Sequence, residues 1–108
     1  MTHFEFIESA VFSAHLADYL TDEEYAVLQE HLCEAPEAGD LVRGSGGVRK
    51  IRWARAGGGK SGGVRVCYYA RTRRGQILLL VIYAKSAQDS IAGTVLKALR
   101  EELEDDLD

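Results

Sequence analysis

Apolar and polar side chains alternate in three stretches of this chain of 108 residues. Alternation with a period of two is typical of a β-strand that is buried on one face, and it marks residues 3–7, 48–55 and 64–71. Residues 76–85 are apolar on both faces, as expected for the central strand of a sheet. Short connections between the last three stretches predict a three-stranded antiparallel meander.

Helical spacing occupies the region between the first strand and the meander. Ser9 is a candidate N-cap for a first helix. Thr21 and Glu24 have the spacing of a capping box, in which each side chain bonds the other residue's backbone N–H, and they predict the start of a second helix. Pro36, the only proline, ends that helix because its ring cannot continue the helical backbone. The pattern therefore predicts a helical hairpin.

A final helix follows the meander, with either Ser86 or Asp89 as its N-cap. Its last part, 101–108, is strongly acidic and is expected to fray. The full order is strand, helix, helix, three-stranded meander, helix, which is an α+β fold in one domain spanning 1–108. Cys33 and Cys67 are far apart in sequence and are expected to be buried free thiols.

Charge divides the chain into three parts. Residues 1–40 hold ten acids and no Lys or Arg, 41–88 hold eleven bases and no acid, and 89–108 hold seven acids and two bases. The formal charges are therefore −10, +11 and −5, which together give the net −4. Such asymmetry indicates an anionic partner for the middle part, with nucleic acid as the first candidate.

The predicted strands gather part of this positive charge on one face of the sheet. Lys50, Arg52 and Arg65 fall on the non-core side of two neighbouring strands, and Lys85 ends the central strand. An ordinary solvated sheet face is the alternative interpretation. A solvated face usually mixes both signs of charge, however, and like charges repel unless they bind something.

Other motifs exclude several classes of function. The segment Gly59-Lys60-Ser61 resembles part of a P-loop, but Ala54 stands where that motif needs a glycine, and a strand follows instead of a helix. The glycine loop around Lys60 is either a flexible connection or a phosphate-gripping loop. The three histidines share no metal-like spacing, so we expect no metal and no cofactor. The start of the chain lacks the pattern of a signal peptide, and the longest apolar run is too short to span a membrane; we expect a soluble, cytoplasmic protein.

The order of elements and several motifs resemble the RelE/ParE superfamily of bacterial toxins, and the HigB-like branch in particular. The resemblance is carried by the helix start at residues 21–25, by the Gly-rich approach to Arg49-Lys50-Ile51-Arg52, by residues 59–69 and by the strand end Tyr83-Ala84-Lys85. It covers nearly the whole chain. It implies a RelE-like fold and a type II toxin that acts as a ribosome-dependent mRNA endonuclease (mRNA interferase), inhibits translation and is neutralised by a cognate helix-turn-helix antitoxin (HigA-like).

The same resemblance assigns the chemistry to basic residues of the sheet. By position, the catalytic residues are Lys50, Arg52, Arg65 and Lys85, with the RNA's own 2′-OH as the nucleophile. Arg65 is expected to stabilise charge on the phosphate. A lysine crowded by other cations gives up its proton more readily, so Lys50, or alternatively Lys85 or Lys60, is expected to act as the base. Further RNA contacts are expected from the remaining basic residues: Arg49, Arg55, Lys60, Arg71, Arg73 and Arg74.

The sequence departs from the family pattern in two places. Ser86 stands where relatives often carry an arginine, and no tyrosine or histidine follows Tyr83. The identity of the general acid therefore stays open at this point. A ParE-like toxin, which has the same fold but binds and inhibits DNA gyrase without nuclease chemistry, is the alternative function. The clustering of Lys50, Arg52 and Arg65 argues against it.

Overall fold

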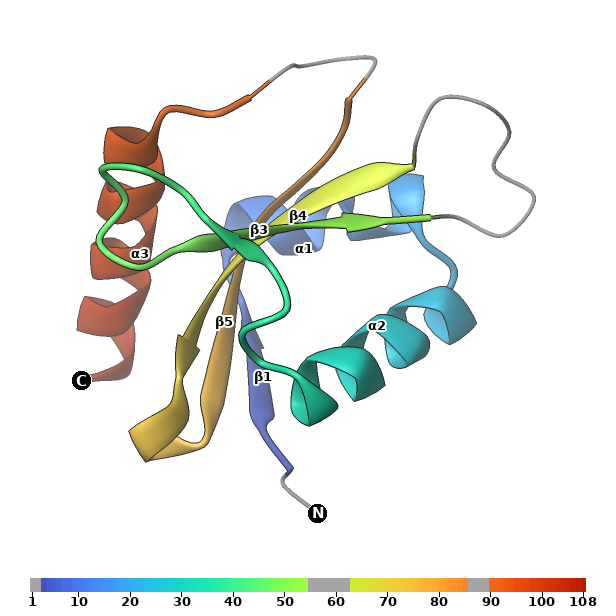
Figure 1. The fold of residues 1–108 in the computed structure, drawn as a ribbon, viewed down its shortest axis with the longest axis horizontal. Helices are drawn as coiled ribbons and strands as arrows, with labels where there is room; N and C mark the ends of the chain where they lie inside the picture. The colour runs from blue at the N-terminus through green and yellow to red at the C-terminus, as the bar shows by residue number, and fades with distance from the viewer. Residues whose placement is uncertain (1–2, 55–62, 86–89) are drawn as a thin grey trace.

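The computed structural model describes residues 3–54, 63–85 and 90–108. Its five strands form one sheet in the order β1-β5-β4-β3-β2, in which β1 is parallel to β5 and every other neighbouring pair is antiparallel. Figure 1 shows the arrangement. The elements are β1 (Glu5–Glu8), α1 (Ala10–Tyr19), α2 (Asp22–Glu34), β2 (Asp40–Leu41), β3 (Arg49–Trp53), β4 (Val64–Arg71), the 3-10 turn η1 (Thr72–Arg74), β5 (Gln76–Ala84) and α3 (Gly93–Leu107).

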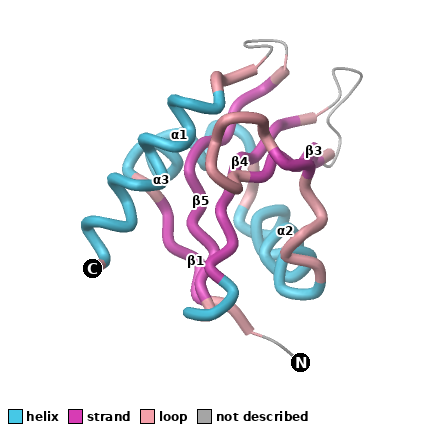
Figure 2. The backbone as a smooth tube through the Cα atoms, turned by 60° about the vertical axis from the view of Figure 1, so that its left-hand side comes forward, coloured by secondary structure: helices cyan, strands magenta, loops and turns pink. Residues whose placement is uncertain are grey.

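The two faces of the sheet carry separate apolar clusters. On the first face, α1 and α2 pack against the strands through residues that include Phe12, Leu28 and Tyr68. On the second face, α3 packs through Leu96 against Leu78 and other strand residues. Figure 2 shows α2 and α3 on opposite sides of the strands. The predicted α+β order is therefore confirmed, with the helices divided between the two faces.

Local signals in the helical hairpin are confirmed. The Ser9 hydroxyl accepts a hydrogen bond from Phe12 N at 3.0 Å and donates one to Leu80 O at 2.7 Å, so this cap also ties α1 to the centre of the sheet. Thr21 and Glu24 form the predicted capping box, with hydrogen bonds of 2.8 and 3.1 Å. These caps satisfy backbone N–H groups that have no partner inside a helix.

The alternation of the strands also follows the prediction. Val64, Val66 and Tyr68 face the helical hairpin, while Cys67 and Tyr69 belong to the α3 face. In β5, residues from Ile77 to Tyr83 are buried, as the prediction of a central strand required. Cys33 and Cys67 are both free thiols, but only Cys67 is buried and Cys33 is half-buried.

The beginning of α3 differs from the prediction. Its N-cap is Ala92, and no side chain caps it, because the helix begins later than the residues that we expected to cap it. Ser86 and Asp89 lie outside the described residues. Gly93, the first helical residue, lies so close to the backbone of Arg43 that a Cβ there would collide with the Arg43 carbonyl. Close packing against this loop, rather than a polar cap, positions the start of the helix.

The end of α3 also differs from the prediction. The helix continues through the acidic segment to Leu107, where we had expected fraying. Arg71 and Arg74 contact acids of this segment across the gap between α3 and the turn after β4. Partners on the sheet, which lie far away in sequence, therefore hold the acidic segment in place.

Candidate functional site

One row of side chains crosses three strands on the α3 face of the sheet. In register, Arg52 of β3 lies opposite Arg65 of β4, and Arg65 lies opposite Tyr83 of β5. A second row places Lys50 opposite Cys67. Neighbouring strands lie about 4.8 Å apart, so the pairing of the strands by itself brings these side chains close together. Lys50, Arg52 and Arg65 thus share one face, as the alternation predicted.

Lys85 follows the last residue of β5 and lies next to this group. Ala84, its neighbour, pairs with Val64 at the start of β4, one residue before Arg65. We call Lys50, Arg52, Arg65 and Lys85 the cationic cluster. The structure brings three of them onto paired strands and leaves the fourth at the strand end.

The four members differ in exposure. Arg65 is buried, with 6% of its surface exposed, whereas Lys50 is half-buried and Arg52 and Lys85 are exposed. Within the part of the chain that the structure describes, no carboxylate lies within ion-pair distance of Lys50, Arg52 or Lys85. Like charges held together without compensation attract anions strongly. The cluster is therefore suited to bind phosphate, with a buried arginine and two more accessible lysines.

Tyr83 belongs to the same row but was not among the predicted site residues. Its hydroxyl is buried and has no hydrogen-bond partner among the described residues. Burial raises the pKa of Tyr83, while the charge of Arg65 lowers it by a smaller amount. A buried polar group without a partner is uncommon in native structures. The signal in the sequence was the i, i+2 spacing of Tyr83 and Lys85, which places both residues on one side of β5.

Cys67 lies among these cations but stays a neutral thiol. Burial raises its pKa to about 11, and the opposing effect of Lys50 is smaller. A thiolate is the nucleophilic form of cysteine, and this environment disfavours it at neutral pH. Cys67 is therefore part of the packing beneath the cationic cluster.

Arg49, which was predicted to contact RNA, forms hydrogen bonds within the protein, and its RNA contact stays a prediction. Its guanidinium donates hydrogen bonds to the backbone carbonyls of Gly39 at 2.8 Å and Glu37 at 3.3 Å. Arg49 precedes Lys50 by one residue, so alternation turns it toward the opposite face of β3. Arg49 therefore holds the loop after α2 against the sheet.

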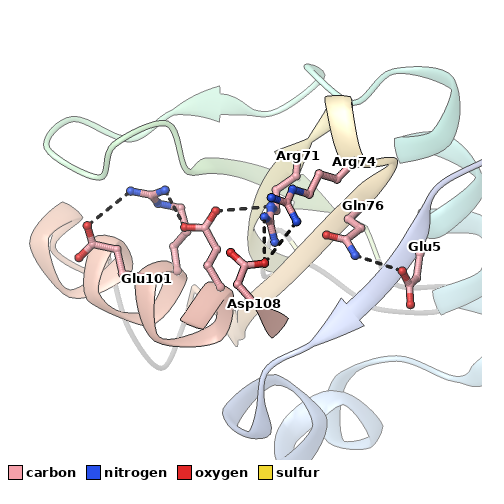
Figure 3. Close-up of polar contacts among 8 residues, drawn as sticks. Glu5, Arg71, Arg74, Gln76, Glu101 and Asp108 are labelled. Carbon is pink, nitrogen blue, oxygen red and sulfur yellow. Dashed lines mark hydrogen bonds and ion pairs between the residues drawn. The ribbon is translucent and has the colours of Figure 1, made fainter. Parts of the chain in front are cut away.

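Arg71 and Arg74 are also engaged within the protein. Arg71 Nε lies 3.5 Å from Glu104 Oε2, and its Nη2 lies 3.5 Å from Asp108 Oδ1. Arg74 Nη1 lies 3.3 Å from the same Asp108 oxygen (Figure 3). The Arg71 side chain is only 9% exposed. The acidic end of α3 therefore pairs with both arginines, and their predicted contacts with RNA stay a prediction.

The remaining predicted RNA contacts fall into two groups. Arg73 is exposed on η1, at the far end of β4 from Arg65, and its predicted role stays a prediction. Arg55 and Lys60 lie outside the described residues. Within residues 3–54, 63–85 and 90–108, no three His, Cys, Asp or Glu side chains gather where they would hold a metal ion. None of the described helices is long and apolar enough to cross a lipid bilayer.

No protein-family model matches the chain. Among solved structures, it is similar to a double arginine-to-alanine mutant of the E. coli toxin RelE in the free state, at 17% sequence identity. The similarity covers 93% of this chain and 98% of that chain, with a TM-score of 0.60. The protein has a RelE-like fold. In this RelE-like fold, the cationic cluster lies on the sheet face that α3 also covers, at the end away from the acidic helix terminus. At this identity the similarity shows the fold alone, and the chemistry has to be argued from the residues.

Proposed function

We propose that the protein is the toxin of a type II toxin–antitoxin system and cleaves translated mRNA on the ribosome. The observation that carries the proposal is the row of Arg52 and Arg65 across paired strands, with Lys50 beside it and no described acid paired with Lys50 or Arg52. The RelE-like fold supports it, because the similar structure is that of a toxin. The resemblance of the strand ends favours the HigB-like branch of these toxins.

The proposed reaction is a transesterification within the RNA. The 2′-oxygen attacks the adjacent phosphorus, the bond from phosphorus to the 5′-oxygen breaks, and the products are a 2′,3′-cyclic phosphate and a 5′-hydroxyl. Two protons move: one leaves the 2′-hydroxyl and one reaches the departing 5′-oxygen. The protein has to position the strand, stabilise the extra charge on the phosphate and transfer these protons.

The cluster provides a group for each task. Arg65 is fixed by burial and presents a planar fork of donors that fits two phosphate oxygens. Arg52, which is exposed and directly opposite, holds the neighbouring phosphate. Lys50 is the proposed base, with Lys85 at the strand end as the alternative. The ribosome contributes by holding the message in place, since positioning alone can remove a large part of a reaction barrier.

Neutralisation by a cognate antitoxin follows from the same proposal. A HigA-like helix-turn-helix protein either covers the cationic cluster with acidic residues or binds elsewhere and blocks entry to the ribosome. The alternative function, gyrase inhibition in the manner of a ParE-like toxin, has no need for cations packed in register on one sheet face.

The test is induction in cells of wild type, Arg65→Ala and Arg52→Ala, followed by primer extension on an abundant translated message. Arg52 is exposed, so its substitution spares the fold, whereas Arg65→Ala needs a thermal melt as a control for folding. We expect growth arrest and cuts in translated RNA for wild type and neither for the two variants. Growth arrest with intact messages would contradict the nuclease proposal and favour gyrase as the target.

A further inference from the structure

A cavity begins where the row of Arg52, Arg65 and Tyr83 ends. It encloses about 250 Å³ and lies between α1, the last part of β5 and Ile91. Its walls are Val11, His15 and Tyr19 of α1, Val81 to Tyr83 of β5, and Ile91. Tyr83 is therefore shared: it pairs in register with Arg65 on one side and lines the cavity on the other.

The topology of the sheet explains why this space exists. β1 pairs with β5 only from Gln76 to Leu79, and its last residue, Glu8, lies opposite Leu79. Beyond that point, no described strand covers the outer edge of β5. The chain turns into α1 instead, and Ser9 fastens the turn to Leu80. Beyond Leu79, β5 is therefore the edge strand among the described residues, and one strand spacing of about 4.8 Å separates the Arg65 backbone from this strand, which borders the cavity.

The side chains that line the cavity fit a flat, uncharged ring. Tyr19, His15 and Tyr83 supply aromatic surfaces, and Val11 and Ile91 supply apolar ones. Among the described residues that line the cavity there is no Lys or Arg. The carboxylate near it, Asp18, lies 3.7 Å from His15 Nδ1. Aromatic side chains that leave a base face accessible are the common platform for nucleobases in single-stranded RNA.

One polar group at this site lacks a partner. Tyr83 is only 5% exposed, and its buried hydroxyl makes no hydrogen bond to any described residue. Buried hydroxyls are nearly always hydrogen-bonded, and a ligand can supply the missing partner once the Tyr83 side chain shifts toward the cavity. The edges of nucleobases carry donors and acceptors that can serve as that partner.

We propose that this cavity is a nucleobase subsite, which takes the base of a nucleotide whose phosphate is held by Arg65. The inference rests on the proposed RNA-cleaving function and adds a determinant of sequence preference to it. The phosphate binds in the cationic cluster, the ribose passes over Tyr83, and the base enters between α1 and Ile91. The Tyr83 hydroxyl reads one edge of that base and is a specificity-determining group.

The experiment compares two tryptophan substitutions at exposed valines. Val11→Trp fills the mouth of the cavity, and Val27→Trp places the same side chain on α2, away from it; the two valines are 45% and 57% exposed. Tyr83→Phe removes the lone hydroxyl while keeping the ring. Each variant is induced in cells, and cut sites across translated messages are mapped by sequencing of RNA ends. Thermal melts confirm that each variant folds.

We expect Val27→Trp to reproduce the wild-type cut sites. Val11→Trp is expected to weaken the preference at one nucleotide position by about tenfold, the size of a lost stacking contact. Tyr83→Phe is expected to change the preference at the same position by about fivefold. Both substitutions are expected to change the preference at the same nucleotide position. A general disturbance of the structure by either substitution would not single out one position.

Three outcomes would overturn the subsite. If Val11→Trp cuts the same sites in the same proportions as Val27→Trp, the cavity plays no part in base selection while the nuclease function stands. If Val11→Trp keeps its cut sites but no longer co-purifies with the antitoxin, the cavity is a protein-docking site. If wild type itself leaves no cuts, the proposed function fails, and the subsite fails with it.

Discussion

An arginine lies near each end of β4 on the same face of the sheet, but the charges around the two arginines differ. Arg65 lies opposite Arg52 and one row from Lys50. Arg71, six residues further and about 20 Å away along the strand, lies against Glu104 and Asp108. Arg100 continues that second group, with its guanidinium 2.9 Å from Glu104 and 4.7 Å from the centre of the Tyr69 ring.

The distribution of charge along α3 explains the difference. The first part of the helix, from Gly93 to Arg100, contains no acid, and every acid of α3 lies in its last turns. Among the described residues, these last turns and Asp108 after them form ion pairs with Arg71 and Arg74 (Figure 3). The fold therefore pairs one group of arginines with acids of α3, whereas no described acid pairs with Arg52 or Lys50 at the other end of the sheet. Charge in the sequence alone cannot separate two such groups, since both belong to the same basic block.

The largest expected effect comes from reversing charge at each end. Arg52→Glu is expected to reduce cleavage of ribosome-bound mRNA by about 100-fold, because it places a carboxylate where a phosphate has to bind. Arg73→Glu, an equally exposed arginine at the other end of β4, is the matched control and is expected to reduce cleavage less than about threefold. Single-turnover cleavage of a defined message measures both. Equal losses of cleavage in the two variants would contradict the proposed difference between the two ends of β4.

The second prediction concerns stability at the Arg71 end. Glu104→Gln removes the carboxylate charge that contacts both Arg71 and Arg100. The two guanidinium groups, which are largely buried, then lose this negative partner. The free energy of unfolding is expected to fall by about 2 kcal/mol, with cleavage unchanged. Glu102→Gln, on the exposed side of the same helix turn, is expected to change stability by less than about 0.5 kcal/mol. Urea unfolding measures both, and a large loss of cleavage in Glu104→Gln would mean that the two ends are coupled.

The third prediction uses pH to examine the layer beneath the cationic cluster. Burial raises the pKa of Cys67 from its ordinary value of 9.0 to about 11. The folded state therefore holds this proton more tightly than the unfolded state, so the stabilisation is present below pH 9.0 and is lost as pH rises toward about 11. Between these limits, the free energy of unfolding is expected to fall by about 1–2 kcal/mol more in wild type than in Cys67→Ala. Urea unfolding of both proteins at about pH 8 and about pH 11 measures this, and an identical pH dependence would mean that Cys67 is accessible to solvent.

Much of the fold was predictable because its signals are local. The Ser9 cap, the capping box of Thr21 with Glu24, and the alternation of β4 each depend on residues within a few positions of one another. The start of α3 was mispredicted because it depends on the approach of Gly93 to Arg43, which lies fifty residues away in sequence. The acidic end of α3 is likewise held in place by Arg71 and Arg74. The sequence alone does not show that these arginines lie next to α3.

The site was predictable to the extent that strand alternation determines it. The placement of Lys50, Arg52 and Arg65 on one face follows from a period of two and from antiparallel pairing. That Arg49, Arg71 and Arg74 bind carbonyls and carboxylates of the chain itself could not be predicted, because those partners come from other elements. The lone hydroxyl of Tyr83 is a property of packing and was invisible for the same reason.

The most direct test of the account is a charge-conserving exchange at both ends of β4. Arg65→Lys and Arg71→Lys keep the charge but lose the planar fork of donors. The rate of single-turnover cleavage of ribosome-bound mRNA is then compared with the free energy of unfolding. We predict that the folded Arg65→Lys protein cleaves about 100-fold more slowly than wild type, and that Arg71→Lys lowers stability at an unchanged rate. Full cleavage by a folded Arg65→Lys protein would contradict the proposal that this arginine stabilises the reacting phosphate.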